Sequence, residues 1–340
     1  MSRTRLQALL LGAALLGAAL PWAGAAGAAA GFDLSRPEIQ SFIAGAARQP
    51  PLTRARVTRI LRQARPNPRV IDKISTPAET VLPWWQYRAN FVTDQRIAEG
   101  AQFWRLHRAA LEEVARVEGV APEYIVAILG CETRFGRITG KNRVLDSLST
   151  LAFDYPARAD FFRSELLQFL LLTREAHLDP LTVKGSYTGA MGAPQFMPSS
   201  YRSYGVDADH DQHVDLWNDW PDIFASVANL LKQNGWQTDA PVLAEAQLAP
   251  GTPAPEAPRM LDLTQTLDGL KAAGILTQSD LPGSTPAVLI AAEQATGPAF
   301  RVGFRNFYVI SRYNRSARYA MAVDDLAHAI AAAVREAHAD

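Results

Sequence analysis

A series of long helical patterns occupies the centre of the chain and limits its fold more than any other feature. Apolar residues recur at helical spacing over 94–118, 122–135, 158–177 and 221–234. Gly, Pro, Asn and Asp occupy the segments between these patterns, as expected at helix boundaries. Segments rich in Val, Ile, Phe and Tyr, which favour strands, occur late, over 287–292 and 301–311. The sequence therefore predicts a mainly α protein of the α+β class, with a small β region.

Changes of composition divide the chain into regions. An arginine-rich stretch interrupted by prolines includes short helical patterns over 42–47 and 54–64, and a Pro/Ala-rich stretch over 241–258 indicates a linker. Two further helices are predicted over 263–274 and 321–337. We expect an N-terminal α region over 31–83, a helical core over 84–236, a linker with the small β region over 237–304, and a C-terminal segment over 305–340.

The first 28 residues have the pattern of a secretory signal peptide. Arg3 and Arg5 precede an apolar stretch over 8–20, and small residues of the A-x-A type follow over 23–28. A membrane anchor is the alternative, but the apolar stretch is short for a span of about 20 residues. No cysteine follows the stretch, so a lipoprotein is not expected. The sequence predicts export of a soluble mature chain.

Charge and cysteine content exclude several classes of function. Lys+Arg and Asp+Glu are both 34, so the formal net charge is zero. A nucleic-acid-binding protein usually has a basic excess, so this class is disfavoured. Cys131 is the single cysteine of the sequence. An intramolecular disulfide and a CxxC zinc or redox site are therefore impossible.

A glutamate interrupts the apolar stripe of the helix predicted after Pro122. The stripe runs through Ile125, Ile128 and Leu129, and the next position on it is Glu132. Burial disfavours the charged form of a carboxyl group and raises its pKa. A raised pKa is what a general acid needs near neutral pH. Glu132 is therefore a candidate general acid or base.

The position of Glu132 also has a purely structural interpretation. Arg134, Arg137 or Arg143 would then hold the carboxylate in an ion pair, because structural ion pairs also place carboxylates on apolar faces. Gly136 indicates that the helix ends just after Glu132, which leaves the carboxyl group near an opening.

Three groups of segments form an ordered set of motifs. The first comprises 130–137 (GCETRFGR), 140–141 and 145–151 (LDSLSTL), and the second comprises 184–192 (KGSYTGAMG), 195–201 (QFMPSSY), 216–217 and 226–229. The third comprises 306–308 (NFY), 312–316 (RYNRS) and 319–320. Together these segments resemble the lytic murein transglycosylase B family. The resemblance covers about residues 84–323 and is looser over 237–300.

The resemblance implies a lysozyme-like helical core over 84–236, flanked by an α region and a small β region. It implies an enzyme that cleaves the β-1,4 bond between N-acetylmuramic acid and N-acetylglucosamine without water and leaves a 1,6-anhydromuramoyl end. By this resemblance Glu132 is the single catalytic acid/base, without a cofactor. The residues matched to the saccharide cleft are Ser186, Gln195, Tyr313, Asn314, Tyr319 and Tyr87.

The resemblance also implies partners and a location. The expected partners are the glycan strands of peptidoglycan, with cell-wall synthesis proteins as further candidates. We expect a monomer in the periplasm. A hydrolytic lysozyme-like muramidase and a peptidoglycan-binding module without activity remain the alternative functions at this point.

A mechanism with one carboxylate is chemically complete. Most glycosidases use two carboxyl groups, one of them as nucleophile or base. With Glu132 alone, the C6 hydroxyl of the muramoyl unit must be the nucleophile. Glu132 would protonate the leaving glycosidic oxygen and then accept the C6 hydroxyl proton as the ring closes. The attack is intramolecular, so it gains a high effective molarity.

An acidic loop near the cleft has the spacing of an EF-hand. Asp207, Asp209, Asp211 and Asp215 stand at positions 1, 3, 5 and 9, and His213 offers a backbone carbonyl at position 7. Gln212 replaces the usual position-6 Gly, and Asn218 stands where the closing Glu is expected. The resemblance allows a longer loop that Asp222 would close. We predict a structural Ca²⁺ held by Asp207, Asp209, Asp211, His213 and Asp222, with a solvated acidic turn as the alternative.

Overall fold

A computed structural model describes residues 31–75, 82–256 and 261–337. The predicted signal peptide, residues 1–28, lies outside the described residues. The described chain is mainly helical, with a two-stranded ribbon and a five-stranded sheet. The predicted fold class is therefore confirmed. Within the described ranges, no helix is both long enough and apolar enough to cross a bilayer.

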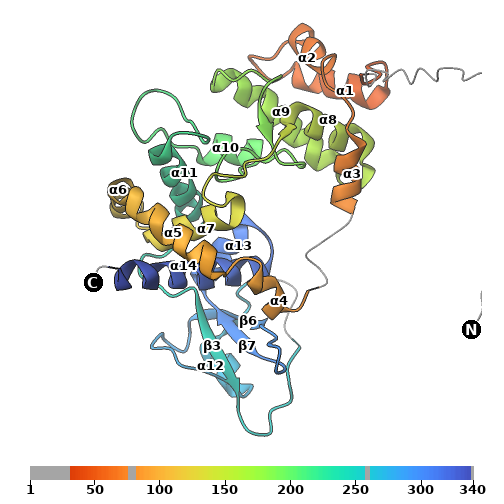
Figure 1. Cartoon of the computed structure of the whole chain (residues 1–340). Coiled ribbons are helices and arrows are strands. Elements are labelled where there is room, and N and C mark those ends of the chain that lie inside the picture. The colour runs from red at the N-terminus through yellow and green to blue at the C-terminus, as the bar shows by residue number, and fades with distance from the viewer. Residues whose placement is uncertain (1–30, 76–81, 257–260, 338–340) are drawn as a thin grey trace, which may run out of the picture.

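The N-terminal α region consists of α1 (Pro37–Ala46), α2 (Arg54–Leu61) and α3 (Pro68–Ser75). These helices lie around α8 (Val144–Asp154) and α9 (Ala159–Glu175), at the top of Figure 1. Thr53 caps α2 by accepting a hydrogen bond from the Arg56 backbone N–H at 3.2 Å. The apolar face of α2, formed by Val57, Ile60 and Leu61, is buried, so burial as well as capping stabilises this short helix.

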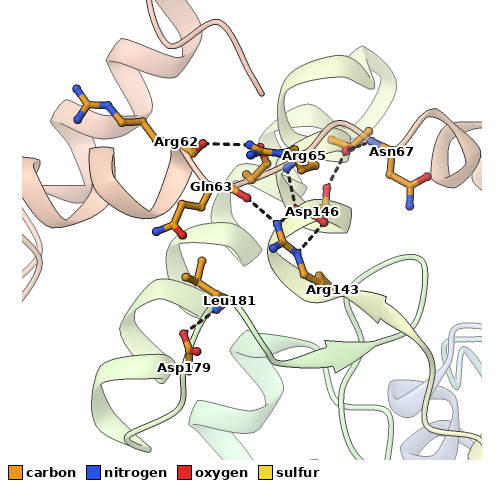
Figure 2. Close-up of polar contacts among 10 residues, drawn as sticks. Arg62, Gln63, Arg65, Asn67, Arg143, Asp146, Asp179 and Leu181 are labelled. Carbon is orange, nitrogen blue, oxygen red and sulfur yellow. Dashed lines mark hydrogen bonds and ion pairs between the residues drawn. The ribbon is translucent and has the colours of Figure 1, made fainter. Parts of the chain in front are cut away.

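Asp146 of α8 joins the N-terminal region to the core (Figure 2). Its carboxylate accepts hydrogen bonds from the Arg65 backbone N–H at 2.8 Å and from Arg143 Nε at 2.8 Å. The Thr150 hydroxyl accepts the Asn67 N–H at 2.9 Å and donates to the Asp146 carbonyl at 2.7 Å. The segment that leads from α2 to α3 is thus fixed to α8 by hydrogen bonds to its backbone.

The helical core is built around α14 (Ala317–Glu336), which packs against α7 (Pro122–Thr133) and α5 (Asp94–Leu106). In Figure 1, α14 runs across the molecule below α5 and α7. Its neighbours include α13 (Arg305–Tyr313) and α4 (Trp84–Ala89). The remaining elements of the core are α6 (Arg108–Glu118), the 3₁₀ helix η1 (Pro156–Arg158), α10 (Pro198–Tyr204) and α11 (Trp220–Gln233).

The small β region contains a sheet with the strand order β4-β6-β7-β3-β5, in which the pairings are antiparallel. Its buried side chains form a second, smaller core that includes Leu289, Phe300 and Val302. The elements are β3 (Leu243–Leu248), β4 (Gln265–Thr266), α12 (Leu267–Ala272), β5 (Ile275–Thr277), β6 (Pro286–Ala291) and β7 (Phe300–Gly303). In the helical core, β1 (Asn142–Arg143) pairs with β2 (Lys184–Gly185).

Three predicted segments differ from the structure. The strand predicted over 301–311 is wrong, because β7 ends at Gly303 and α13 follows. Its β-branched and aromatic residues lie on the buried face of a helix, since packing overrides strand propensity. The pattern over 94–118 forms two helices, which meet at His107. The predicted linker over 241–258 includes strand β3, because this segment pairs with β5 and β7.

Candidate active site

Glu132 lies in the last turn of α7, which ends one residue later. Arg134, Phe135 and Gly136 all have positive φ angles, of 50°, 60° and 79°. The Phe135 N–H donates to the Leu129 carbonyl at 3.0 Å and so caps the helix end. Two of these left-handed residues, Arg134 and Phe135, are not glycine. The left-handed backbone conformation is unfavourable for such residues, so the end of the helix here is strained. The Glu132 side chain is half-buried, as predicted for a carboxyl group near an opening.

Thr133 connects the end of α7 to the segment that carries Gln195. Its buried hydroxyl donates to the Ala193 carbonyl at 2.8 Å and accepts the Gly136 N–H at 2.9 Å. Both bonds are made next to Glu132, so they restrain the backbone that carries the carboxyl group. Sequence analysis missed this role, because a threonine beside a candidate catalytic residue carries no signal of its own.

Tyr319 of α14 is the hydrogen-bond donor to Glu132. Its hydroxyl lies 2.6 Å from Glu132 Oε1. Ser316 caps α14 by accepting the Tyr319 N–H at 3.2 Å, which fixes the first turn of the helix. The Tyr313 ring stacks on the Tyr319 ring with centroids 6.4 Å apart and planes 17° apart. The structure thus places both predicted tyrosines beside the predicted acid/base.

The electrostatics of these tyrosines favour neutral hydroxyl groups. Burial raises the pKa of Tyr319 and of Tyr313 well above the usual value, and the nearby Glu132 carboxylate raises both further. Tyr319 therefore remains a proton-bearing donor at neutral pH. A hydrogen bond from a neutral donor to a carboxylate is among the stronger kinds.

The arginines close to Glu132 in sequence have other carboxylate partners. Arg137 pairs with Glu99 at 2.8 Å, and Arg134 lies 3.5 Å from the same carboxylate. Arg143 pairs with Asp146 at 2.5 Å. Each of the three arginines named in the structural interpretation of Glu132 thus has a carboxylate partner in Glu99 or Asp146.

Gln195 is held in a left-handed turn with φ of 51°. Its Nε2 donates to the Gly192 carbonyl at 2.9 Å and to the Thr139 carbonyl at 3.0 Å. The Tyr313 hydroxyl donates to the Pro194 carbonyl at 2.5 Å, which joins this turn to the tyrosine pair. Gln195 and Tyr313 both line a cavity of about 150 Å³.

Three further predicted cleft residues have described contacts with residues other than Glu132: Ser186, Asn314 and Tyr87. The Ser186 Oγ accepts the N–H groups of Thr188 at 3.2 Å and Ala190 at 3.0 Å, so it organises the turn after β2. Asn314 ends α13 between Tyr313 and the cap of α14. The Tyr87 ring packs in α4 with centroids 5.1 Å from Phe91. Saccharide contact by these three residues remains a prediction.

The acidic loop brings three of its predicted ligands together. Carboxylate oxygens of Asp207, Asp209 and Asp211 lie within 4.8 Å of one another, and Asp207 Oδ1 is buried with no hydrogen-bond partner among the described residues. The Gln212 backbone has φ of 75°, so it adopts the left-handed conformation that a position-6 Gly would supply. Three carboxylates, one of which has an oxygen without a hydrogen-bond partner among the described residues, are suitable donors for Ca²⁺.

Asp222 lies outside this group of three and connects the two ends of the loop. Its oxygens accept the N–H groups of Ala208 at 2.7 Å and Asp215 at 2.9 Å. Asp222 as a residue is 1% exposed, and the pKa of its carboxyl group is raised by burial and lowered in part by these hydrogen bonds. Asp222 therefore fixes the loop onto α11, whatever else it binds.

The comparisons with known proteins agree with this geometry. The family model described as a transglycosylase SLT domain matches residues 35–328. The membrane-bound lytic murein transglycosylase B of Escherichia coli (strain K12) is 41% identical over 308 residues, which cover 88% of this chain and 84% of the relative. The chain belongs to the SLT transglycosylase family. The predicted resemblance and enzyme class are thereby confirmed.

Solved structures of SLT transglycosylases superpose well on this one. Soluble lytic transglycosylase SltB1 from Pseudomonas aeruginosa is 45% identical with a TM-score of 0.83, covering 87% of this chain and 99% of that one. Slt35 from E. coli, solved in complex with calcium, is 40% identical with a TM-score of 0.79, covering 90% and 96%. SltB3 from P. aeruginosa, in complex with NAG-anhNAM-pentapeptide, is 30% identical with a TM-score of 0.74, covering 86% and 78%.

Proposed function

We propose that this lytic transglycosylase cleaves the β-1,4 bond between N-acetylmuramic acid and N-acetylglucosamine and leaves a 1,6-anhydromuramoyl end. The observation that carries the proposal is the half-buried Glu132 at the end of α7, with the neutral Tyr319 hydroxyl 2.6 Å from its Oε1. The membership of the SLT transglycosylase family supports the same reaction class.

Glu132 performs both proton transfers in the proposed mechanism. As the acid, it donates its proton to the glycosidic oxygen while the bond from that oxygen to C1 of the muramoyl unit breaks. The C6 hydroxyl oxygen of the same unit then forms a bond to C1, and its proton passes to the Glu132 carboxylate. The enzyme returns to its starting protonation state and no water is consumed. Tyr319 holds the carboxyl group in one orientation for both transfers.

Glu132→Gln tests the assignment, with Glu123→Gln as the matched control in the first turn of the same helix. Loss of the acid/base should lower kcat by about 10²- to 10⁴-fold, the usual contribution of such a group. Binding of glycan strands should be retained, because the amide has nearly the same shape. The control should cleave normally. Cleavage by Glu132→Gln at the wild-type rate would refute the assignment.

The products distinguish the proposed reaction from its alternatives. Purified protein is incubated with peptidoglycan and the released muropeptides are weighed by mass spectrometry. The proposal predicts anhydromuropeptides, each lighter by one water than the hydrolysis product. Reducing ends would instead identify a hydrolytic muramidase, and intact strands would identify a binding module.

We also propose that the acidic loop binds one structural Ca²⁺ through Asp207, Asp209 and Asp211. The convergence of the three carboxylates and the orphaned Asp207 Oδ1 support this site, and the related Slt35 has been solved with calcium. The ion would neutralise the carboxylates and hold the loop together, with no part in the proton transfers. The His213 carbonyl and Asp222 complete the proposed set of ligands.

Thermal unfolding tests the calcium site. Adding Ca²⁺ at 100 times its Kd should stabilise the wild-type protein by about 2.7 kcal/mol relative to the protein in chelator. Asp209→Asn should lose this stabilisation, whereas Asp239→Asn, an exposed aspartate elsewhere, should keep it. An unfolding temperature of the wild-type protein that is indifferent to Ca²⁺ would leave the loop as a solvated acidic turn.

The location and the boundaries of the regions are part of the proposal. The substrate is a wall polymer, and the first 28 residues have the pattern of an export signal, which supports a periplasmic enzyme. The relative from E. coli is described as membrane-bound. We propose that residues 84–236 with 305–340 provide the catalytic core, and that residues 31–83 and 237–304 flank it.

A further inference from the structure

The ribbon of β1 and β2 has one buried and one cationic face. Arg143 pairs with Lys184 in the antiparallel register, and the Val144 N–H continues the ladder by donating to the Val183 carbonyl at 3.0 Å. Side chains alternate between the two faces of a strand. Val144 and Val183 are buried on one face. Arg143 and Lys184 therefore lie on the other.

The same register places two more residues on the cationic face. Ser186 is two residues beyond Lys184, and Lys141 is two residues before Arg143, so both share the face of that pair. Continuing the ladder by these two residues sets Lys141 opposite Ser186. Lys141 and Lys184 are exposed, and Ser186 is half-buried. A residue predicted to contact the saccharide thus has lysines beside it.

Helix α3 adds a cation from the N-terminal region. The Lys73 ammonium lies 5.8 Å from the ring centroid of Tyr187, the residue that follows Ser186. We call the group formed by Lys73, Lys141, Arg143 and Lys184 the cationic edge. It combines side chains from α3 and from both strands of the ribbon, so it is assembled by tertiary structure.

The cationic edge has more positive than negative charge. Arg143 is neutralised by Asp146, whereas Lys73, Lys141 and Lys184 form no ion pair within the described ranges. The adjacent Arg65 guanidinium donates to the Arg62 carbonyl at 3.2 Å (Figure 2). It also donates to the Ala64 carbonyl at 3.3 Å, and because both acceptors are neutral it keeps its full charge. The ion pair with Asp146 also offsets the repulsion between Arg143 and Lys184, which stand opposite each other in the register.

The type of cation is also informative. The chain has five lysines, and three of them belong to the cationic edge. Arginine presents a rigid fork suited to one fixed carboxylate, whereas lysine is a point charge on a flexible stem. Three exposed lysines therefore suit a ligand with several carboxylates whose positions vary.

We propose that the cationic edge binds the carboxylates of the peptide arm carried by the muramoyl unit that lies at Ser186. This inference rests on the proposed function, because it takes a peptidoglycan strand as the ligand. The sugar units of the strand are uncharged, whereas the peptide arms carry free carboxylates. A cationic surface beside a serine that is predicted to contact the saccharide therefore matches the arm and not the glycan.

The test compares two substrates and two variants. The substrates are glycan strands with their peptide arms and the same strands after an amidase has removed the arms and the lactyl carboxylates that it leaves have been converted to neutral amides. The variants are Lys73→Gln/Lys141→Gln/Lys184→Gln and a control, Lys232→Gln/Lys271→Gln/Arg335→Gln, which removes three exposed cations in α11, α12 and α14. Circular dichroism and thermal unfolding establish that both variants fold.

On strands with peptide arms, the cationic-edge variant should have a KM about 5- to 10-fold above wild type, with kcat unchanged. On strands without arms, its KM should equal that of wild type. The control should match wild type on both substrates. Raising the ionic strength should raise the wild-type KM on strands with arms and leave that of the variant unchanged, because salt screens exposed charges.

Two results would overturn the inference. The first is an unchanged KM of the cationic-edge variant on strands with arms. The second is an equal rise of its KM on both substrates, which would mean that the lysines act on the glycan or on the cleft itself. Failure of the proposed function has a different signature, since the wild-type protein would then cleave neither substrate.

Discussion

Glu132 and Tyr319 differ in how their positions are determined. Glu132 is placed by its own helix, which ends one residue later in a run of left-handed residues. Tyr319 comes from α14, which begins at Ala317. That start is 184 residues after the end of α7 at Thr133. Its neutral hydroxyl favours one orientation of the carboxyl group. Without this donor the carboxyl group would lose a restraint on its orientation.

We expect Tyr319→Phe to lower kcat by about 10- to 100-fold, because a hydrogen bond to a charged group contributes about 1.5–3 kcal/mol. KM should change less than kcat, since the other residues matched to the saccharide cleft remain. The matched control is Tyr124→Phe, which removes another buried hydroxyl from the α7–α14 contact, where it donates to Asp324 at 3.0 Å. The control should lose stability and keep kcat. Equal losses of kcat in both variants would assign the effect to helix packing.

The predicted site residues were found from two kinds of signal. The break in the apolar stripe of α7 pointed to Glu132, because a carboxyl group on a buried face is costly unless it is used. Gln195, Tyr313 and Tyr319 came only from motif resemblance. Thr133 gave no signal at all. Its importance depends on the Ala193 carbonyl, whose approach to α7 is a matter of tertiary structure.

At the scale of elements, the short ribbon of β1 and β2 organises the side of the site that carries Ser186. Gly140 precedes this ribbon with φ of 98°, and a Cβ atom there would lie 2.1 Å from the Gly185 carbonyl oxygen. The preceding carbonyl, of Thr139, accepts the Gln195 side chain. One glycine thus allows the ribbon, the Ser186 turn and the Gln195 turn to approach one another.

Gly140→Ala should destabilise the protein by about 3 kcal/mol or more, from left-handed strain of about 1–2 kcal/mol added to a clash with backbone. Gly251→Ala is the control, since Gly251 has a similar φ of 81° and open space around it. The control should show the strain alone. Urea unfolding and kcat/KM of both variants check this. Equal unfolding free energies of the two variants would show that the close approach of Gly140 to the Gly185 carbonyl does not contribute to the destabilisation.

The elements themselves were predictable where the helical pattern was long. The helices over 122–135, 158–177 and 221–234 appear within two residues of the predicted ends. The break between α5 and α6 was not predictable, because His107 is neither Gly nor Pro. Its ring packs against Trp220 and Phe224 of α11, and a local pattern does not report such tertiary contacts. The mistaken strand over 301–311 likewise reflects burial that a local pattern cannot report.

At the scale of the whole molecule, the contact between α7 and α14 includes a second polar pair. The buried Asp324 accepts the Tyr124 hydroxyl, and burial raises the pKa of its carboxyl group to about 6. The His328 imidazole lies 3.6 Å away and lowers this pKa in part. The folded state therefore binds a proton more tightly at Asp324 than the unfolded state, whose pKa is near the ordinary 3.8.

The sign of the pH dependence follows from this difference. Between about pH 4 and pH 6 the folded protein holds a proton that the unfolded chain has released, so the contribution of Asp324 to stability falls as pH rises. Asp324→Asn should remove this slope and should be at least as stable as its parent at pH 7. Urea unfolding at several pH values checks this in a His328→Gln background, which removes the neighbouring imidazole. An unchanged slope in the Asn variant would assign the titration to another group.

The hydrogen bond between Glu132 and Tyr319 joins residues 187 positions apart, and the one between Tyr124 and Asp324 joins residues 200 apart. Contacts of such long sequence separation form slowly, since most of the chain must be arranged before its ends can meet. We therefore expect α7 to acquire its helical structure long before its glutamate acquires a fixed orientation. A partly folded chain would carry the reactive group without the means to use it. We therefore expect the capacity to cleave peptidoglycan to arise late in folding.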